Sequence, residues 1–283
     1  MTDRLPVTKT HKLYIGGTFP RTESGRSIAV RNASREVLAH VCQGSRKDVR
    51  NAVEAAHKAQ PKWAGATAYL RGQILYRLAE MMEGRASELA EALAATGAGN
   101  AKAEVAAAID LTIAYAGWAD KWQQVLGTNN AVAGPYYNFT VPEPTGVAAV
   151  IAPDEPGLLG LMALLLPIVC AGNAAICIAS ETHPLIVAPL AECLATSDLP
   201  GGVVNLITGF RHELVEHIAT HRDIDAVHAA SLSAEHASTL RAGSAENLKR
   251  VTLHDAVALD TAADPWWIEP FVEMKTVWHP SAV

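Results

Sequence analysis

Acidic and imidazole residues that could do chemistry come directly after apolar runs of the chain. Asp154 and Glu155 follow residues 147–152 and precede a helical run, where carboxylates could bind a cation or the basic residue of a partner. Acidic residues also cap helix N-termini, and capping is the simpler interpretation of this pair. His254 and Asp255 follow the later run 250–253 and are the one pair that could support acid–base catalysis.

Three histidines share one predicted helix and could bind a metal ion. His217 and His221 are four residues apart and His212 precedes them, but no third ligand is evident. A solvated helix face explains these residues better, and we predict no metal site.

The four cysteines are predicted to be small, buried side chains. None forms a CxxC pair and three lie inside apolar runs, which is typical of reduced thiols and not of disulfides or metal ligands. They are Cys42, Cys170, Cys177 and Cys193.

Strand-like and helical runs alternate from Thr145 onward, and these elements must position the polar residues. Alternation at this spacing predicts an α/β fold, a doubly wound parallel sheet of the Rossmann type with helices on both faces. We expect strands at 147–152, 174–179, 203–208, 226–230 and 250–253, and helices at 158–171, 186–196, 212–221 and 234–243.

Long helices precede this pattern and short β segments flank it. Helical periodicity predicts helices over 45–60, 68–95 and 101–126, which would cover the sheet. We expect an edge strand and hairpin at 12–19, a two-stranded excursion at 129–142, and a final strand at 271–278 that must pair with the chain or with another chain. We assign 8–126 and 145–258 to one dinucleotide-fold domain, and 127–144 with 264–283 to a small oligomerisation β-extension.

Composition excludes several classes of partner. The 283 residues carry a net charge of −6, and no basic patch is interleaved with aromatic residues, so nucleic acid is not an expected partner. The longest apolar stretch, 158–171, contains Pro167 and is too short to span a bilayer. The first residues lack the apolar core of a signal peptide, so we expect no membrane attachment and a cytoplasmic location.

The order of these segments resembles the aldehyde dehydrogenase superfamily. The most specific segment, LPGGVVNLITG, is similar to that family's LPPGVVNVVTG, and EPTGVAAVIAP resembles its first Rossmann strand. The resembling segments are 12–19, 49–63, 143–153, 199–209, 247–253 and 271–277.

The resemblance implies a reaction whose groups are missing here. In that reaction a cysteine thiolate attacks the aldehyde, amide groups hold the oxyanion and a glutamate activates water. Glu155 stands at the oxyanion asparagine of a PWNFP motif, and His254 stands at the glutamate of an ELGGK motif. No cysteine follows Cys193, and the family's catalytic domain is reduced to a short linker between Leu253 and Phe271.

The cofactor motifs are also altered. Ile178 replaces the ribose-binding lysine of a KPSE motif, although Ser180 and Glu181 are kept as candidate, vestigial cofactor-binding residues. The glycine-rich GSTxxG turn becomes Ala230–Glu235, and no glycine occurs over 226–240, so side chains should obstruct a pyrophosphate. We therefore expect no cofactor, or only weak binding of NAD or NADP.

Within the superfamily, the chain most resembles the cysteine-lacking second module of aldehyde dehydrogenase family 16. That module also has a PDE sequence in place of PWN and an ending similar to residues 274–280. We therefore expect a non-catalytic subunit that assembles with a catalytic aldehyde dehydrogenase, with itself, or with both. The alternatives are an active NAD(P)-dependent oxidoreductase with an unusual site, and a nucleotide-binding module without chemistry.

The expected interface is formed by the end of the chain. Tandem tryptophans beside a strand without a partner could anchor another subunit or plug the shortened sheet, and we favour the interface. We expect Trp266, Trp267 and Phe271 to be exposed in a monomer. The candidate interface residues are Trp266, Trp267, Phe271, Val272, Met274, Thr276 and Trp278.

Overall fold

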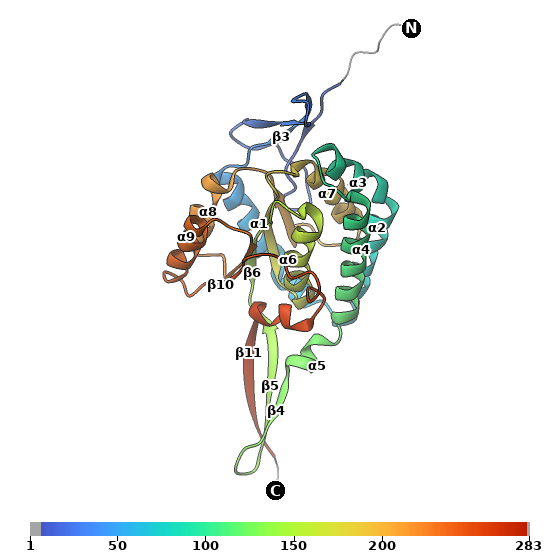
Figure 1. Cartoon of the computed structure of the whole chain (residues 1–283). Coiled ribbons are helices and arrows are strands. Elements are labelled where there is room, and N and C mark those ends of the chain that lie inside the picture. Colours follow the sequence, from blue (N-terminus) through green and yellow to red (C-terminus); the bar gives the residue numbers. More distant parts are fainter. Residues whose placement is uncertain (1–6, 282–283) are drawn as a thin grey trace, which may run out of the picture.

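The computed structural model describes residues 7–281, and a five-stranded parallel sheet lies at its centre (Figure 1). The strand order is β10-β9-β6-β7-β8, so the chain winds away from β6 first in one direction and then in the other. This order confirms the predicted doubly wound sheet and places the reversal between β6 and β9. The strands are β6 Val147–Ile151, β7 Ala174–Ile178, β8 Val204–Ile207, β9 Ala226–Ala230 and β10 Arg250–His254.

Helices cover both faces of this sheet. Val147, Ala149 and Ile151 of β6 pack into one apolar cluster with α1, α8 and α9, whereas Ala148 and Val150 pack into another with α2, α3, α4, α6 and α7. Strands that are apolar on both sides are typical of parallel sheets. The helices are α1 Arg46–Ala64, α2 Ala68–Gly84, α3 Ala86–Ala95, α4 Ala101–Trp118, α5 Trp122–Leu126, α6 Gly157–Ala171, α7 Val187–Thr196, α8 Arg211–Thr220 and α9 Ala234–Ser244.

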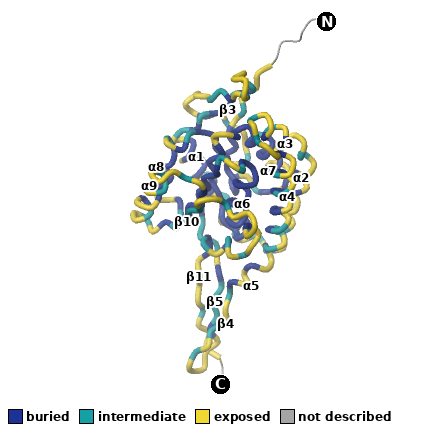
Figure 2. Tube along the Cα trace, viewed as in Figure 1, coloured by how far each residue is buried: buried dark blue, intermediate teal, exposed yellow. Residues whose placement is uncertain are grey.

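Helix α6 is buried along its whole length, between the sheet and the outer helices (Figure 2). It is apolar on every side, as expected of a helix that solvent does not reach. Gly172 ends it with a φ of 100°, a left-handed conformation that glycine adopts without strain. Neither α6 nor another helix within residues 7–281 is long and apolar enough to cross a membrane.

Two of the predicted long helices are each divided in the structure. The chain turns at Arg85 between α2 and α3, and at residues 119–121 between α4 and α5. Apolar spacing did not reveal the first break, because Leu78 and Met82 of α2 bury into the same cluster as Leu89 and Leu93 of α3.

A small sheet that the sequence analysis missed covers one end of the molecule. It has the order β1-β3-β2, with β1 Thr10–His11, β2 Ser27–Arg31 and β3 Val37–Cys42. The predicted hairpin at 12–19 is present as a single bridge between Ile15 and Thr18. Gly17 has a φ of 78°, and a Cβ there would lie 2.8 Å from Cα of Gly201. Tyr14 bridges to Leu206 and so joins this segment to β8.

An antiparallel sheet projects from the body as an arm (Figure 1). Its order is β11-β5-β4, with β4 Thr128–Asn130, β5 Tyr136–Pro144 and β11 Val272–Pro280. The predicted excursion and final strand are therefore both present, and β11 pairs with β5 along its whole length. The outer edge of β11 has no strand partner among residues 7–281.

Candidate functional site

The loops that follow the strands of the central sheet meet at its carboxyl edge, where open α/β sheets bind ligands. Asp154 and Glu155 follow β6, Ser180 and Glu181 follow β7, and His254 is the last residue of β10. All the candidate site residues of the sheet domain are therefore at one edge.

Asp154 forms a two-pronged ion pair with Arg211, the first residue of α8. The guanidinium nitrogens lie 2.7 and 2.9 Å from the two carboxylate oxygens, and one of them also donates to the carbonyl of Ala152 at 2.8 Å. Burial alone would raise the pKa of Asp154, but the hydrogen bonds and charge of Arg211, with the N–H groups of Thr182 and Glu181, hold it below its usual value. Asp154 is thus a carboxylate locked to Arg211.

The preferred interpretation of Asp154 as a helix cap is wrong. The N-cap residue of α6 is Pro156, and its first N–H groups, those of Leu158 and Leu159, donate to the carboxylate of Glu104 at 2.7 and 3.1 Å. Asp154 instead binds Arg211 of its own chain. The other interpretation had been that it binds the basic residue of a partner.

The two residues kept from the KPSE motif are engaged within the chain. The Ser180 hydroxyl lies 3.2 Å from Oδ1 of Asp154, and the same Oδ1 accepts the N–H of Glu181 at 2.8 Å. Oε1 of Glu181 accepts the N–H of Arg211 at 2.7 Å and so caps α8. Ile178, at the lysine position, is fully buried in the sheet.

Glu155 is held by a buried histidine. Nε2 of His183 donates to Oε1 of Glu155 at 2.7 Å, and Nδ1 of the same ring lies 2.6 Å from the hydroxyl of Thr96. His183 is buried, whereas the Glu155 side chain is mostly exposed. A carboxylate presented to solvent at this position offers no donor to an oxyanion.

His254 is part of an aromatic cluster and is not an open acid–base group. Nδ1 of His228 donates to the carbonyl of Leu164 at 2.8 Å, which leaves its Nε2 to accept from Nε2 of His254 at 2.9 Å. Trp267 stacks on His254 with the ring centroids 4.6 Å apart and the planes 12° apart. Burial lowers the pKa of His254 and lowers that of His228 to about 3, so both rings are neutral near pH 7.

The turn between β9 and α9 keeps a glycine-like backbone without a glycine. Ser231 has a φ of 55°, which a side chain makes costly, and its N–H donates to the carbonyl of His254 at 2.9 Å. The Ser233 hydroxyl accepts the N–H of His236 and caps α9. The turn therefore carries side chains and no glycine, and their obstruction of a pyrophosphate stays a prediction.

All four cysteines are buried and free. Burial raises the pKa of the Cys170 and Cys193 thiols to about 12 and also raises that of Cys177. A thiol that is not ionised is a poor nucleophile.

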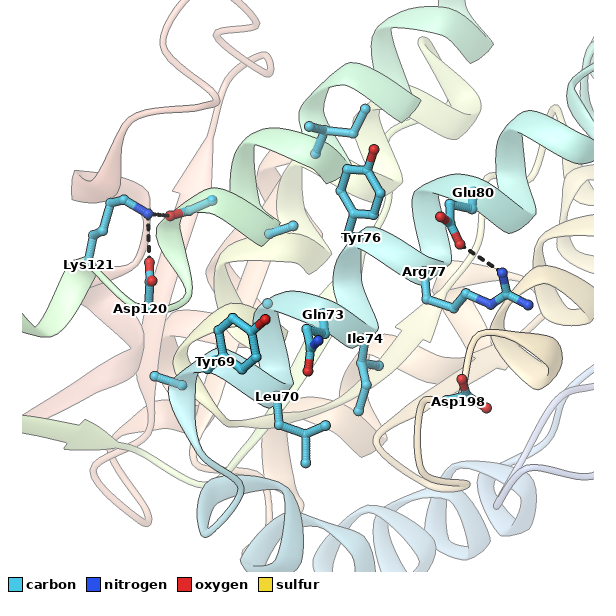
Figure 3. A pocket seen from close by; sticks show the side chains of 15 residues that line it. Tyr69, Leu70, Gln73, Ile74, Tyr76, Arg77, Glu80, Asp120, Lys121 and Asp198 are labelled. Carbon is cyan, nitrogen blue, oxygen red and sulfur yellow. Dashed lines mark hydrogen bonds and ion pairs between the residues drawn. The ribbon is translucent and has the colours of Figure 1, made fainter.

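A hollow with a volume of about 870 Å³ lies away from this edge, between α2 and α4 (Figure 3). Tyr69, Gln73 and Tyr76 line it from α2. Its basic residues are paired, Arg77 with Glu80 and Lys121 with Asp120. Its lining contains no cysteine, so it holds no thiol that could attack an aldehyde.

Comparison with known proteins decides the family. A sequence profile described as the aldehyde dehydrogenase family matches residues 20–256. The chain belongs to the aldehyde dehydrogenase family. It is 34% identical over 253 residues to a protein named aldehyde dehydrogenase, cytosolic 1, from Elephantulus edwardii, covering 86% of this chain and 49% of that one. It is 29% identical over 259 residues to omega-crystallin of Enteroctopus dofleini, covering 89% and 51%.

Solved aldehyde dehydrogenases share the fold. A structure of the NAD+ complex of aldehyde dehydrogenase from Bacillus cereus superposes with a TM-score of 0.81 at 27% identity, covering 89% of this chain and 54% of that one. The chain therefore spans about half the length of the aldehyde dehydrogenases that it matches.

The candidate interface residues divide into two groups in this aldehyde dehydrogenase-like chain. Trp266 and Trp278 are each 59% exposed, and Met274 and Thr276 are exposed on β11. The remaining residues lie in the chain's own core. The expected exposure of Phe271 is wrong, because its ring is fully buried, and Val272 and Trp267 are buried and half-buried respectively. The 255–271 linker folds back over the sheet and uses these apolar side chains to do so.

Arg211, His183 and His228 were missed as members of the site. Arg211 begins α8, and nothing local in the sequence indicates that its side chain reaches back to Asp154, 57 residues earlier. His228 could have been found from the sequence, because it is the one polar residue within the apolar run that forms β9. Among residues 7–281, no group of three histidine, cysteine or acidic side chains could hold a metal ion.

Proposed function

We propose that this chain is a non-catalytic subunit that assembles with a catalytic aldehyde dehydrogenase or with a second copy of itself. The observation that carries the proposal is the state of the carboxyl edge of the sheet. Three hydrogen-bond donors at that edge are already engaged within the chain. The N–H of Glu181 and the guanidinium of Arg211 donate to Asp154, and the N–H of Arg211 donates to Glu181. Trp267 covers His254.

The chemistry of the side chains supports the same proposal. Cys170, Cys177 and Cys193 are buried with raised pKa values, and Cys42 is also buried, so no exposed thiol is available for covalent attack. Glu155 offers a carboxylate where an oxyanion needs a donor. The omega-crystallin relative carries a name that is not that of an enzyme. Free, buried cysteines favour a reducing compartment, and we place the subunit in the cytoplasm.

We infer that the arm is the joint between subunits. The outer edge of β11 pairs with no other strand among residues 7–281, and such an edge is a template for another strand. Met274 and Trp278 add exposed apolar area on the same strand. The joint therefore consists of β11 and its exposed side chains, without Phe271 and Val272.

Co-purification of tagged chains with a co-expressed catalytic aldehyde dehydrogenase, combined with native mass measurement, tests this proposal. Removing residues 273–283 keeps the buried Phe271 and Val272 and should leave a folded body that no longer assembles. Tyr69→Ala, a change of an exposed aromatic side chain on α2 outside the arm, is the matched control and should assemble normally. Undiminished assembly of the shortened chain would remove the main support for the joint.

A nucleotide-binding module without chemistry is the second candidate, because the fold matches a solved NAD+ complex of a related enzyme. Titration calorimetry with NAD and with NADP separates the two candidates. We expect no saturation at cellular cofactor levels, because Asp154 and Glu181 occupy the donors. Saturable binding in the low micromolar range would favour the second candidate.

A further inference from the structure

A small hollow of about 260 Å³ lies between α1 and α8, and its walls are rich in positive charge. Arg46 and Arg50 line it from α1, while His217, His221 and Arg222 line it from the end of α8 and the turn that follows. Asp223 is the one carboxylate in the lining. This clustering is local, because the chain as a whole carries a net charge of −6.

Most of the charge in this hollow is not neutralised by the protein. No ion pair within residues 7–281 uses Arg46 or Arg222. Arg50 lies 3.5 Å from Glu54, but both side chains are more than half exposed, so this pair is weak. Three guanidinium groups around one small space repel one another unless an anion lies between them.

The ring of His221 lies in the lining of this hollow, among charges of both signs. Its Nδ1 accepts the N–H of Asp223 at 3.2 Å, so the neutral ring keeps its proton on Nε2 and can donate it. Burial lowers the pKa of His221, and the charges of Lys249 and His57 lower it further, against opposing effects of Asp223 and Glu54. The carbonyl of His221 also accepts from Lys249 at 2.7 Å, which holds that cation close by.

We propose that this hollow binds a phosphate group, either inorganic phosphate or the phosphoryl end of a small phosphomonoester. Arginine is the side chain best suited to a phosphate, because its planar fork donates two parallel hydrogen bonds. The volume is below the range of about 300–1,000 Å³ that pockets for drug-sized ligands occupy, which favours a compact anion. Asp223 offsets one of the three arginines, so the remaining guanidinium groups and the histidines balance the anion.

The proposal does not depend on the carboxyl-edge site. Arg211 begins α8 at that edge, whereas His217, His221 and Arg222 belong to the last turn of the same helix and the residues after it. If the chain did not assemble with another subunit, or if it bound NAD, the phosphate proposal would still stand. If phosphate did not bind, the proposed subunit function would likewise still stand.

Nuclear magnetic resonance of the histidine rings in the whole chain tests the proposal. Titration with sodium phosphate at constant ionic strength should shift the His221 and His217 signals saturably and raise the pKa of His221, because binding and protonation are linked. Glycerol phosphate in a parallel titration distinguishes the sources. Tighter binding of glycerol phosphate than of phosphate indicates a phosphorylated metabolite, and equal binding indicates inorganic phosphate.

Exposed arginines provide the variants and the matched control. Arg46→Gln and Arg222→Gln should each weaken phosphate binding at least about tenfold, the effect of losing one charge-assisted hydrogen bond. Arg241→Gln on α9 makes the same charge change outside the hollow and should leave the affinity unchanged. Circular dichroism and the unfolding midpoint check that each variant is folded.

Three results would overturn the proposal. These are the absence of a saturable shift with phosphate, an equal shift with sodium chloride at the same ionic strength, and an equal loss of affinity in Arg241→Gln.

Discussion

Replacing Trp267 by alanine should destabilise the chain, because this side chain closes the 255–271 linker over the sheet. Truncating a fully buried tryptophan costs about 3–5 kcal/mol, and the half-buried position of Trp267 reduces this to about 2–3 kcal/mol. The stacked pair with His254, at 4.6 Å, adds about 0.5–1.5 kcal/mol. For a chain of this size the Tm should fall by roughly 5–10 °C, measured by circular dichroism during heating.

The neighbouring tryptophan provides the matched control. Trp266 is 59% exposed, so Trp266→Ala should change the free energy of unfolding by less than about 1 kcal/mol. Trp267→Ala should also raise the pKa of His254 toward its usual value, because burial is what lowers it. Equal Tm losses in the two variants, or an unchanged His254 pKa, would refute the assignment of Trp267 as the cover of this edge.

Three further predictions concern the carboxyl edge and the arm. Asp154→Asn should lower the free energy of unfolding by about 1–3 kcal/mol in urea, because Arg211 loses its partner, and an unchanged midpoint would contradict this. Folding lowers the pKa of His228 to about 3 and also lowers that of His254, below the value of about 6.5 in the unfolded chain. The free energy of unfolding should therefore be greatest above about pH 6.5 and fall as the pH drops toward 3. A flat profile from pH 7 to pH 4 would contradict this. Lys275→Glu should weaken the arm, because Lys275 pairs with Glu143 at 2.9 Å, and faster backbone hydrogen exchange in β5 and β11 is the expected result; exchange identical to that of the unchanged chain would oppose it.

The sheet domain could be predicted from sequence because its signals are local. Each strand of the sheet is a short apolar run bounded by helical periodicity, and the observed strand ends differ from the predicted ones by at most one residue. The small β1-β3-β2 sheet was missed because its strands are short and only partly buried, so their residues lack the continuous apolar pattern of β6 or β7.

The polar site could be predicted only in part. The motif positions of Glu155 and His254 were readable, but their partners were not. His183 is 28 residues from Glu155, and His228 is 26 residues from His254, so only the fold brings these pairs together. The burial of Phe271 was missed for a related reason, since no local pattern shows that the linker returns to the core.

Incubation of the purified chain with NAD or NADP and a series of aldehydes tests the central claim most directly. The absorbance of the reduced nicotinamide should not rise above that of a control without protein, because all four cysteines are buried and the donors at the carboxyl edge are bonded within the chain. A rate above the control that disappears in a variant of this chain, such as His254→Ala or Cys193→Ala, would contradict the claim.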